Sequence, residues 1–422
     1  MTKIKNNEIT HSSNSGTSNV VMASNGDVTT ARDLIATGDL TVTGNDIKSS
    51  GATAITMSGA NVTVAGTLTS TGGFVGISSV CARNYITNGD MQVAQRGASF
   101  TGGGTTDISK NDDDDYTLDQ WILLSDGNDI VDVTQATEVP TAGATNSIAL
   151  DVETTNRKFG ILQVIEGKDC KSIIGGTASL SFKMKASAVD KLDSVKAAII
   201  SWSSTVDAVT SDVVSAWGAE GTRPTLATNW TYENTNSSGT TGNFTPTTSW
   251  ATYTLKNVSI DTSSTTNVAV FIWSDVTDTT AGQFLYITDV QLEAGADTTD
   301  YLRKRYDDEL RNCTRYLYAH IQDVHEPLST GDKYGSSTGH SIIPFMNVMR
   351  ANPTALIING TSYWQYQSTG NQDEYDTITF LRSSQKAAVI KHEGNFAGGY
   401  QGYAKTAWSD NAAARLIFTA EL

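Results

Sequence analysis

The stretches Thr37-Gly-Asp-Leu-Thr-Val-Thr-Gly44 and Ser58-Gly-Ala-Asn-Val-Thr-Val-Ala-Gly66 decide how the N-terminal part of this chain folds. Each alternates small apolar and polar residues with period two and ends in a glycine, the pattern of a short β-strand closed by a turn. The first 73 residues contain no aromatic residue and no proline, so they hold too little apolar bulk to bury a core within one chain. We therefore expect several copies of the chain to pair around one axis and form a β shaft over residues 1–80.

The composition of the whole chain is that of an all-β protein with many turns. Its 422 residues are only 18% charged and include 36 glycines but six prolines, and this length allows two or three domains. The 29 basic and 45 acidic residues give a net charge of −16. Because binding to phosphates requires clusters of Lys and Arg, we expect no nucleic-acid partner.

The cysteines and the first residues indicate where the protein matures. Cys81, Cys170 and Cys313 are far apart in sequence and do not have the spacing of a metal site. We expect reduced thiols in a protein that matures in a reducing cytoplasm, with an interchain disulfide as the alternative. The first residues lack the apolar core of a signal peptide, and no run of about 18 apolar residues occurs. If the protein acts outside the cell, we therefore expect it to leave by lysis or on a particle and not by the secretory route.

Residues 81–300 show the strand patterns of a β-sandwich. The segment Ala178-Ser-Leu-Ser-Phe-Lys-Met-Lys185 alternates and places Leu180, Phe182 and Met184 on one face. Further short apolar or alternating runs lie at 121–124, 130–133, 147–152, 159–165, 196–202, 250–255, 268–273 and 284–292. Such runs separated by polar turns predict two packed antiparallel sheets of the jelly-roll kind, with Ser203–Thr248 as a long, turn-rich excursion.

One helix and a β-rich tip are predicted beyond this sandwich. A helix over Tyr301–Ala319, capped by Asp300, is predicted because apolar residues recur there at helical spacing, namely Leu302, Tyr306, Leu310, Cys313 and Leu317. Residues 320–422 return to strand patterns, at 341–345, 355–358, 377–381, 387–390 and 415–422. The predicted organisation is therefore an N-terminal β shaft over 1–80, a jelly-roll sandwich over 81–300, a connecting helix over 301–319 and a tip domain over 320–422.

Five motifs in this order resemble those of bacteriophage tail fibres. They are Asn84-Tyr-Ile-Thr-Asn-Gly-Asp-Met-Gln-Val-Ala-Gln-Arg-Gly97, Tyr116-Thr-Leu-Asp-Gln-Trp121, Phe284-Leu-Tyr-Ile-Thr-Asp-Val-Gln-Leu-Glu-Ala-Gly295, the helix motif Tyr301-Leu-Arg-Lys-Arg-Tyr306 with Glu309-Leu-Arg-Asn-Cys-Thr-Arg-Tyr316, and Pro344-Phe-Met-Asn-Val-Met-Arg-Ala-Asn-Pro-Thr354. In such fibres the first three belong to a carbohydrate-binding-like jelly-roll module, and the last belongs to a distal domain. The resemblance, best to fibres of short-tailed phages, implies a homotrimer.

This resemblance also implies partners and a location. The N-terminus would attach to a tail adaptor or nozzle protein of the virion, and a receptor would be contacted toward the C-terminus. The receptor would be a host surface glycan or an outer-membrane receptor. The protein would be made in the host cytoplasm and act in the tail fibre of the virion. Three copies of a weak surface site on one fibre then give lasting attachment through avidity.

Aromatic residues set among polar ones are the candidate receptor contacts. Sugar rings present apolar C–H faces that stack on Trp and Tyr, while their hydroxyl groups need Asn, Asp and Gln nearby. Two segments of the tip have this composition, and the candidates in them are Tyr363, Trp364, Tyr366, Tyr400, Tyr403 and Trp408, with Trp217 and Trp230 of the sandwich excursion as secondary candidates. The alternative is that these rings belong to the core or to a trimer interface.

No catalytic residues, metal or cofactor are predicted. The run Asn111-Asp-Asp-Asp-Asp115 could bind a Ca²⁺ ion through Asp112–Asp115, but it lacks the Gly and Glu spacing of a calcium loop and also suits a solvated acidic loop. No local arrangement nominates the two carboxylates of a glycosidase. We therefore predict host recognition without catalysis. The alternatives are a tailspike-type enzyme that degrades polysaccharide and a structural connector for another fibre protein.

Overall fold

The chain is almost entirely β, which confirms the predicted fold class. A computed structural model describes residues 8–9, 20–22, 28–30, 46–49, 52–58, 61–64, 84–102, 108–141, 143–233, 242–262, 264–333, 335, 337–368, 371–394 and 404–422. The chain divides into two compact units, Met1–Ser78 and Ser79–Leu422. Among the described helices, none is long and apolar enough to span a bilayer.

The described residues of the N-terminal unit form two small antiparallel sheets. Strands β1 (Glu8–Ile9), β2 (Val20–Met22) and β3 (Val28–Thr30) form the first, and β4 (Asp46–Ser49), β5 (Ala52–Ser58) and β6 (Asn61–Val64) form the second. The strand predicted within 58–66 is therefore present as β6. The strand predicted within 37–44 lies outside the described residues. Pairing here is between segments of one chain, and the pairing between copies stays a prediction.

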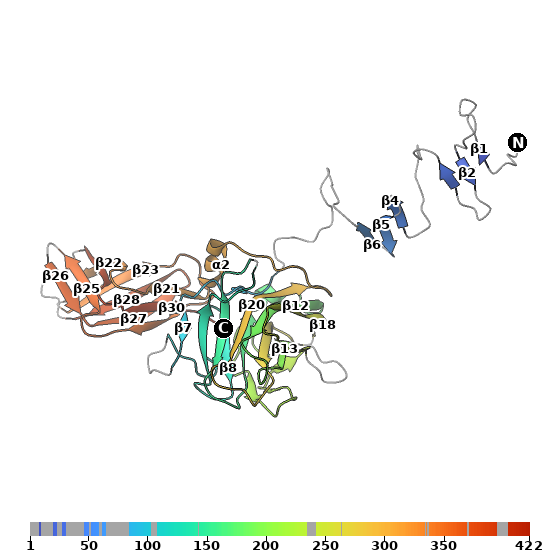
Figure 1. The fold of residues 1–422 in the computed structure, drawn as a ribbon. Helices are drawn as coiled ribbons and strands as arrows, with labels where there is room; N and C mark the ends of the chain where they lie inside the picture. Colours follow the sequence, from blue (N-terminus) through green and yellow to red (C-terminus); the bar gives the residue numbers. More distant parts are fainter. Residues whose placement is uncertain are drawn as a thin grey trace. The chain divides into compact units, whose positions relative to one another are not determined.

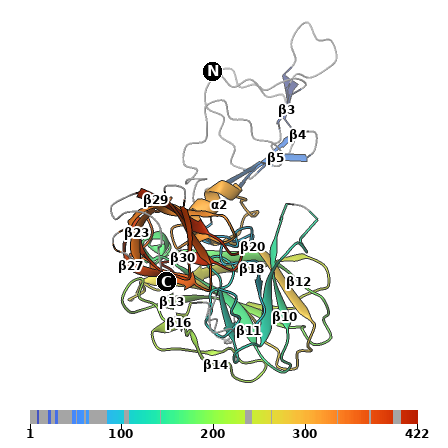
Figure 2. The same ribbon diagram turned by 90° about the vertical axis from the view of Figure 1, so that its left-hand side faces the viewer.

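Two antiparallel sheets lie face to face in the C-terminal unit and form a β-sandwich (Figures 1 and 2). In order across the first sheet the strands are β18 (Ala251–Ser259), β12 (Thr177–Ala186), β20 (Phe284–Ala294), β10 (Ser147–Val152), β9 (Val131–Ala136) and β7 (Ser99–Phe100). Across the second they are β16 (Trp230–Tyr232), β13 (Val195–Trp202), β19 (Asn267–Ser274), β11 (Phe159–Ile165) and β8 (Ile122–Ser125), while β17 (Gly242–Phe244) also pairs with β13.

The sandwich is held together by an apolar core between the two sheets. Leu180, Phe182 and Met184 of β12 are fully buried in it, as their alternation predicts. A second apolar cluster lies on the second sheet, and Trp217 and Trp230 of the excursion belong to it. The excursion contributes β14 (Val214–Ala216) and β15 (Thr225–Leu226) as well as β16 and β17, so much of it is structured rather than a plain loop.

The first two motifs of the sandwich are locked to each other by hydrogen bonds of Asn88. Its backbone has φ 56°, a left-handed conformation that Asn tolerates. The side-chain amide of Asn88 donates to the backbone carbonyl oxygens of Val93 and Asp119. The backbone carbonyl of Asn88 accepts a hydrogen bond from the Trp121 indole. The next residue must be a glycine, Gly89, because an added Cβ there would lie only 2.2 Å from the carbonyl oxygen of Val290. The motifs therefore meet because each completes the other's buried hydrogen bonds.

The predicted helix is much shorter than its apolar periodicity suggests. Helix α2 covers only Tyr306–Cys313 and begins after Arg305, not after Asp300. The residues before it are not helical, because tertiary contacts replace helical ones: the Leu302 N–H donates to the Gln291 side chain and the Lys304 ammonium to the Ile86 carbonyl. Leu302 and Tyr306, expected on the buried stripe, are exposed.

The C-terminal end of the predicted helix is a strand. Strand β21 (Leu317–Ile321) pairs with β30 (Arg415–Thr419), which also pairs with β24 (Thr354–Ile358). Local spacing predicts a helix here, but a distant strand satisfies these backbone groups instead. The short helix α1 (Gly167–Cys170) is an element that the sequence patterns do not predict.

A seven-stranded antiparallel sheet forms most of the predicted tip (Figure 1). Its strands in order are β26 (Asn371–Tyr375), β25 (Trp364–Ser368), β29 (Ala404–Ser409), β22 (Pro327–Lys333), β23 (Thr338–Pro344), β28 (Ala387–Glu393) and β27 (Thr377–Ser384). One apolar core joins this sheet to the three-stranded β21–β30–β24 sheet. Residues 320–422 are thus β-rich, as predicted.

The thiols that the structure describes are buried. Cys170 and Cys313 are free, and burial raises the pKa of the Cys170 thiol to about 11. Such a thiol is protonated and weakly reactive at neutral pH. Cys81 lies outside the described residues.

Candidate functional site

Three aromatic rings lie on the outer face of the first sandwich sheet. Phe284 and Tyr286 alternate along β20 with Leu285 and Ile287, which point into the core. Trp250 immediately precedes β18 and contacts the Tyr286 ring. All three rings are partly exposed. We call Trp250, Phe284 and Tyr286 the aromatic strip.

The rings of the aromatic strip are ordered by one another and by an ion pair. The Phe284 and Tyr286 rings are stacked, with centroids 5.6 Å apart and planes 11° apart, and the Trp250 and Tyr286 centroids are 6.4 Å apart. Lys185 Nζ lies 5.7 Å from the Tyr286 centroid and 2.8 Å from Glu138 Oε1. The Glu138 carboxylate also accepts from the Trp250 indole at 3.4 Å. The surface thus combines ring faces with a donor and an acceptor for hydroxyl groups.

The electrostatics of the aromatic strip are set mainly by the Lys185–Glu138 pair. The hydrogen bond from Lys185 holds the pKa of the Glu138 carboxyl below its usual value. Partial burial raises the pKa of Tyr286, and the charge of Glu138 adds to this effect. At neutral pH the tyrosine is therefore a neutral hydroxyl donor and the glutamate a charged acceptor, which suits neutral hydroxyl-rich ligands.

A group of carboxylates lies beside the aromatic strip, across β10 and β9. Asp151 is the cross-strand partner of Phe284 on one side and of Asp132 on the other. Partial burial, together with the charges of Glu153, Asp129 and Asp151, raises the pKa of Asp132 to about 6. Burial also raises the pKa of Asp151. The like charges of Asp132 and Asp151 directly opposite each other oppose folding at neutral pH.

Replacing Asp132 with asparagine is expected to stabilise the protein in a pH-dependent manner. The folded-state pKa of about 6 exceeds the ordinary 3.8, so the stability contributed by Asp132 is complete below pH 3.8 and is lost as the pH rises through 6. The Asp132→Asn variant should gain ~0.5–1 kcal/mol at pH 8 and little at pH 4. Urea unfolding of both proteins at the two pH values measures this.

The matched control for Asp132→Asn is Asp297→Asn. The Asp297 side chain is 84% exposed and paired with Lys256, so its replacement should change the free energy of unfolding by less than ~0.5 kcal/mol at either pH. An equal gain for Asp132→Asn at pH 4 and pH 8 would show that charge repulsion is not the cause.

Two of the predicted receptor contacts, Trp364 and Tyr366, are core residues. Both belong to β25 and are buried in the tip core, where Trp364 donates through its indole to Asn359. They point inward together because they are two residues apart on one strand. Neither ring has a face open to a ligand, which corrects the prediction for these two residues. Tyr363 is partly exposed, and Tyr400 and Tyr403 lie outside the described residues.

Trp408 is the predicted contact that the structure places at a surface depression. It lies on β29, where its cross-strand partners are Gln365 of β25 on one side and Pro327 of β22 on the other. These residues line a cavity of about 370 Å³ together with His325, Gln372 and Thr406. A partly exposed indole ring among amide and hydroxyl groups is suited to a sugar. We call this surface the tip platform.

The secondary candidates Trp217 and Trp230 are also buried. They pack on the second sandwich sheet, with Trp230 5.3 Å from Trp202 and Trp217 6.0 Å from Phe271 between ring centroids. Trp217 packs on the sheet, which corrects the prediction for that ring. Trp230 also lines a surface depression of about 390 Å³ with Arg223 and Tyr232, so its part in receptor contact stays a prediction. The excursion that carries them brings its own aromatic residues to an apolar face that would otherwise face water.

Buried charges fasten this excursion to the sheet. Asp275 pairs with Lys158 at 3.1 Å and with Lys196 at 2.8 Å, and all three side chains are buried. Lys158 Nζ also donates to the carbonyl oxygens of Ala219 and Thr222 in the excursion. The Asp275 carboxylate accepts in turn from the excursion's Gly221 N–H. We call Lys158, Lys196 and Asp275 the lysine clamp.

The acidic run at 112–115 serves the local backbone. Asp113 accepts the Ser125 N–H at 2.7 Å, and Asp115 accepts the Asp112 N–H at 3.1 Å. Burial and the neighbouring carboxylates raise the pKa of Asp114 to about 7. Over the described part of the chain, no group of three or more Asp, Glu, His or Cys residues is arranged to hold a metal ion.

No family model and no curated protein matches this chain. Solved structures that resemble it include carbohydrate-binding modules and a phage tailspike domain. TmCBM61 in complex with beta-1,4-galactotriose is 13% identical with a TM-score of 0.27, over 50% of this chain and 99% of that chain. The enzymatically active domain of bacteriophage CBA120 tailspike protein 4 is 17% identical with a TM-score of 0.28, over 50% of this chain and 21% of that chain.

A further neighbour is the CBM22-1–GH10 part of the Clostridium thermocellum endo-1,4-beta-D-xylanase 10B, complexed with xylohexaose. It is 11% identical with a TM-score of 0.28, over 44% of this chain and 28% of that chain. At these identities and TM-scores the neighbours assign no function to this chain. The aromatic strip and the tip platform are described by their own geometry.

Proposed function

We propose that this protein is a phage tail fibre that binds a host surface glycan without cleaving it. It forms a homotrimer, its N-terminus attaches to a tail adaptor or nozzle protein of the virion, and its distal domains contact the receptor. The order of the sequence motifs supports this assignment, and Asn88 and Trp121 of two of them share one hydrogen bond. Weak contacts in three copies add through avidity.

The aromatic strip is the observation that carries the glycan-binding part of the proposal. Its three rings are displayed on an open sheet face, although apolar rings are ordinarily buried when a core is available. Sugar C–H faces pack on Phe284 and Tyr286, while hydroxyl groups exchange hydrogen bonds with the nearby Lys185 and Glu138. The tip platform around Trp408 provides a second surface of the same chemistry.

Replacing Tyr286 with alanine is expected to weaken binding to host cells. The ring contacts both other rings of the aromatic strip, and loss of a stacking contact contributing ~1 kcal/mol corresponds to about a fivefold change in affinity for one site. Avidity enlarges this change on the intact fibre. Binding of fluorescently labelled protein to intact host cells, and of one purified surface glycan by calorimetry, measures it.

The controls separate the two surfaces. Tyr306→Ala removes an exposed ring that belongs to neither the aromatic strip nor the tip platform, and it should leave cell binding unchanged. Trp408→Ala tests the tip platform independently, and its effect relative to Tyr286→Ala shows which domain makes the stronger contact. Full cell binding by a Tyr286→Ala, Trp250→Ala double variant would contradict the proposed role of the aromatic strip.

Exposed apolar residues of the tip support self-association. Ile342 on β23 is 64% exposed and Met346 in the following loop is 76% exposed, and Val348 and Leu381 are also exposed. A second and third copy covering these side chains would remove apolar surface from water. Sedimentation equilibrium of the full chain tests the proposal, with a mass of three chains as the expected result and a single chain as the contrary one.

Glycan hydrolysis is the second candidate function, because Asp132 and Asp151 lie opposite each other beside the aromatic strip with raised pKa values. A glycosidase uses two carboxyl groups, one of which is kept protonated near neutral pH. Release of reducing ends from host polysaccharide, abolished by Asp132→Asn, would establish this activity in place of simple binding.

A further inference from the structure

Four acidic side chains lie next to the aromatic strip, at one end of the first sandwich sheet. Asp151 on β10 is the cross-strand partner of Phe284 on one side and of Asp132 on the other. Glu153 directly follows β10, and Asp129 lies two residues before β9, at the same end of these antiparallel strands. Asp132 and Asp151 are partly exposed, and Asp129 and Glu153 are exposed. We call these four residues the acidic row.

The charge of the acidic row is not offset by the lysines of the same sheet face. Burial and the carboxylates of the other three members raise the pKa of Asp132 to about 6, which leaves this group mostly ionised at neutral pH. The lysines are engaged with other acids, since Lys185 pairs with Glu138 and Lys183 with Asp289. The acidic row therefore presents an excess of negative charge beside the rings.

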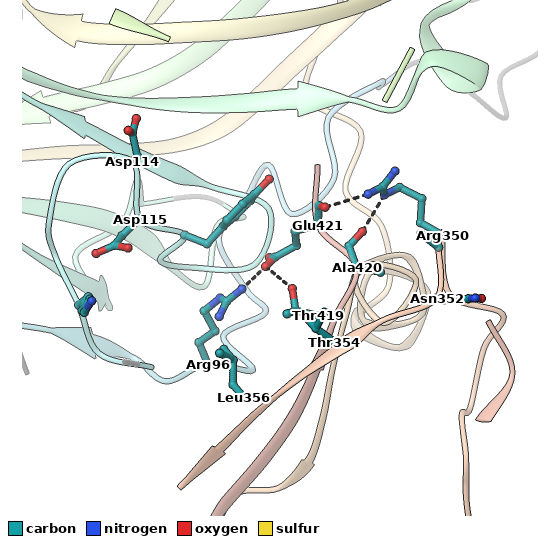
Figure 3. A pocket seen from close by; sticks show the side chains of 13 residues that line it. Arg96, Asp114, Asp115, Arg350, Asn352, Thr354, Leu356, Thr419, Ala420 and Glu421 are labelled. Carbon is teal, nitrogen blue, oxygen red and sulfur yellow. Dashed lines mark hydrogen bonds and ion pairs between the residues drawn. The ribbon is translucent and has the colours of Figure 1, made fainter. Parts of the chain in front are cut away.

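A carboxylate elsewhere in the C-terminal unit shows the contrast. Figure 3 shows Glu421, whose carboxylate accepts from the Arg96 guanidinium and from the Thr419 hydroxyl. The side chains of Arg96 and Glu421 are both more than nine-tenths buried, so this charge is neutralised within the protein. In the acidic row, Asp132 and Asp151 instead lie directly opposite each other and repel. A cation bound from outside would relieve this repulsion.

The arrangement of the acidic row suits a cation carried by a larger ligand rather than a bare metal ion. A Ca²⁺ ion needs several oxygen ligands at about 2.3–2.6 Å from one point. Over the described residues, no group of three or more acidic, His or Cys side chains is arranged in this way. A ligand lying on the aromatic strip could carry the cation, because Phe284 and Asp151 are opposite each other, with Cβ atoms about 5 Å apart in such pairs.

We propose that the aromatic strip selects glycans that carry an unsubstituted amino group over neutral and acidic glycans. A sugar ring stacked on Phe284 places its ammonium group beside the acidic row, and attraction between the charges acts over several ångströms without a direct hydrogen bond. The same row repels carboxylated sugars, while the Lys185–Glu138 pair serves the hydroxyl groups. This inference rests on the function proposed for the aromatic strip and adds the charge class of its ligand.

The test compares tetramers of glucose, glucosamine and glucuronate that share one linkage. Calorimetry uses the full-length protein at about pH 6.5, where Asp132 is mostly ionised and neighbouring carboxylates favour a protonated amine. The glucosamine tetramer should bind about fivefold more tightly than the glucose tetramer. The glucuronate tetramer should bind more weakly than the glucose tetramer, and both differences should shrink at high salt.

Variants assign the preference to the acidic row. An Asp132→Asn, Asp151→Asn double variant keeps the side-chain shapes and removes both charges, so it should bind the glucosamine and glucose tetramers equally well. Its affinity for the glucose tetramer should stay within about twofold of the original. The control Asp297→Asn removes an exposed acid beyond the other end of β20 and should keep the preference.

The outcomes separate this inference from the proposed function. If no tetramer binds, or if Tyr286→Ala leaves every affinity unchanged, glycan binding at the aromatic strip fails and this inference fails with it. If the glucose tetramer binds and Tyr286→Ala weakens it, but the glucosamine tetramer binds no better, only the inference is overturned. A preference for the glucosamine tetramer that persists in the double variant would also overturn the inference alone.

Discussion

Replacing Asp275 with alanine is expected to destabilise the protein by ~3–5 kcal/mol, because it leaves two buried lysines without a carboxylate. The Lys158 side chain is 1% exposed and Lys196 is also buried, and Asp275 is the acid that pairs with both. The same change removes the acceptor of the Gly221 N–H. Denaturant unfolding measures the free-energy change, and limited proteolysis within 217–223 reports release of the excursion.

The control for the lysine clamp is a nearby ion pair of similar length. Lys191 and Asp278 are 2.7 Å apart, but their side chains are 44% and 49% exposed. Asp278→Ala should therefore cost less than ~1 kcal/mol. An intermediate loss is expected for Asp275→Asn, which keeps the shape and part of the hydrogen bonding. Equal losses for Asp275→Ala and Asp278→Ala would show that burial does not set the strength of the clamp.

The Gly89→Ala substitution has the second large expected effect, a loss of ~3 kcal/mol or more. An added Cβ would lie 2.2 Å from the carbonyl oxygen of Val290 and 3.2 Å from the Tyr301 hydroxyl. The Val290 carbonyl belongs to β20 and cannot withdraw without disturbing the sheet, and the Val290 N–H is itself bonded to the Gly89 carbonyl at 2.8 Å. Thermal unfolding of the variant measures the loss.

Gly176→Ala is the matched control for Gly89→Ala. Its added Cβ would meet only the Ile173 carbonyl oxygen at 3.5 Å, an ordinary contact, and its backbone is not left-handed. The expected change in free energy of unfolding is within ~0.5 kcal/mol. A Gly89→Ala protein as stable as Gly176→Ala would show that the opening motif is not pressed against β20 as the structure has it.

Period-two alternation and short apolar runs predict most of the sandwich strands correctly. The segment predicted at 147–152 is β10, and the segment predicted at 159–165 is β11. Both segments are rich in apolar residues, which is typical of a strand that is covered on both faces. The tip strands β22, β26 and β29 are not predicted, since segments such as Asn371-Gln-Asp-Glu-Tyr375 show no apolar alternation. Pairing with β25 makes this polar segment a strand.

The candidate sites are predicted less well, for a reason visible in β20 and β25. Phe284 and Tyr286 alternate with Leu285 and Ile287, so both faces of β20 are apolar in sequence and neither is marked as the outer one. On β25, Trp364 and Tyr366 resemble sugar contacts, although their face packs on the tip core. The sequence of β12 carries a usable signal, because Lys183 and Lys185 mark the outer face of the sheet. Tyr286 lies on the same face, as the cross-strand partner of Lys185.

The sequence by itself determined that this chain is all-β, where most sandwich strands lie, and which side chains share a face. The tertiary structure decided which face is covered, where α2 ends, and that Arg96 and Glu421 meet across 325 positions of the chain. The physical reason is that alternation and turn residues act between neighbours in sequence. Burial depends instead on which distant segment packs against each face.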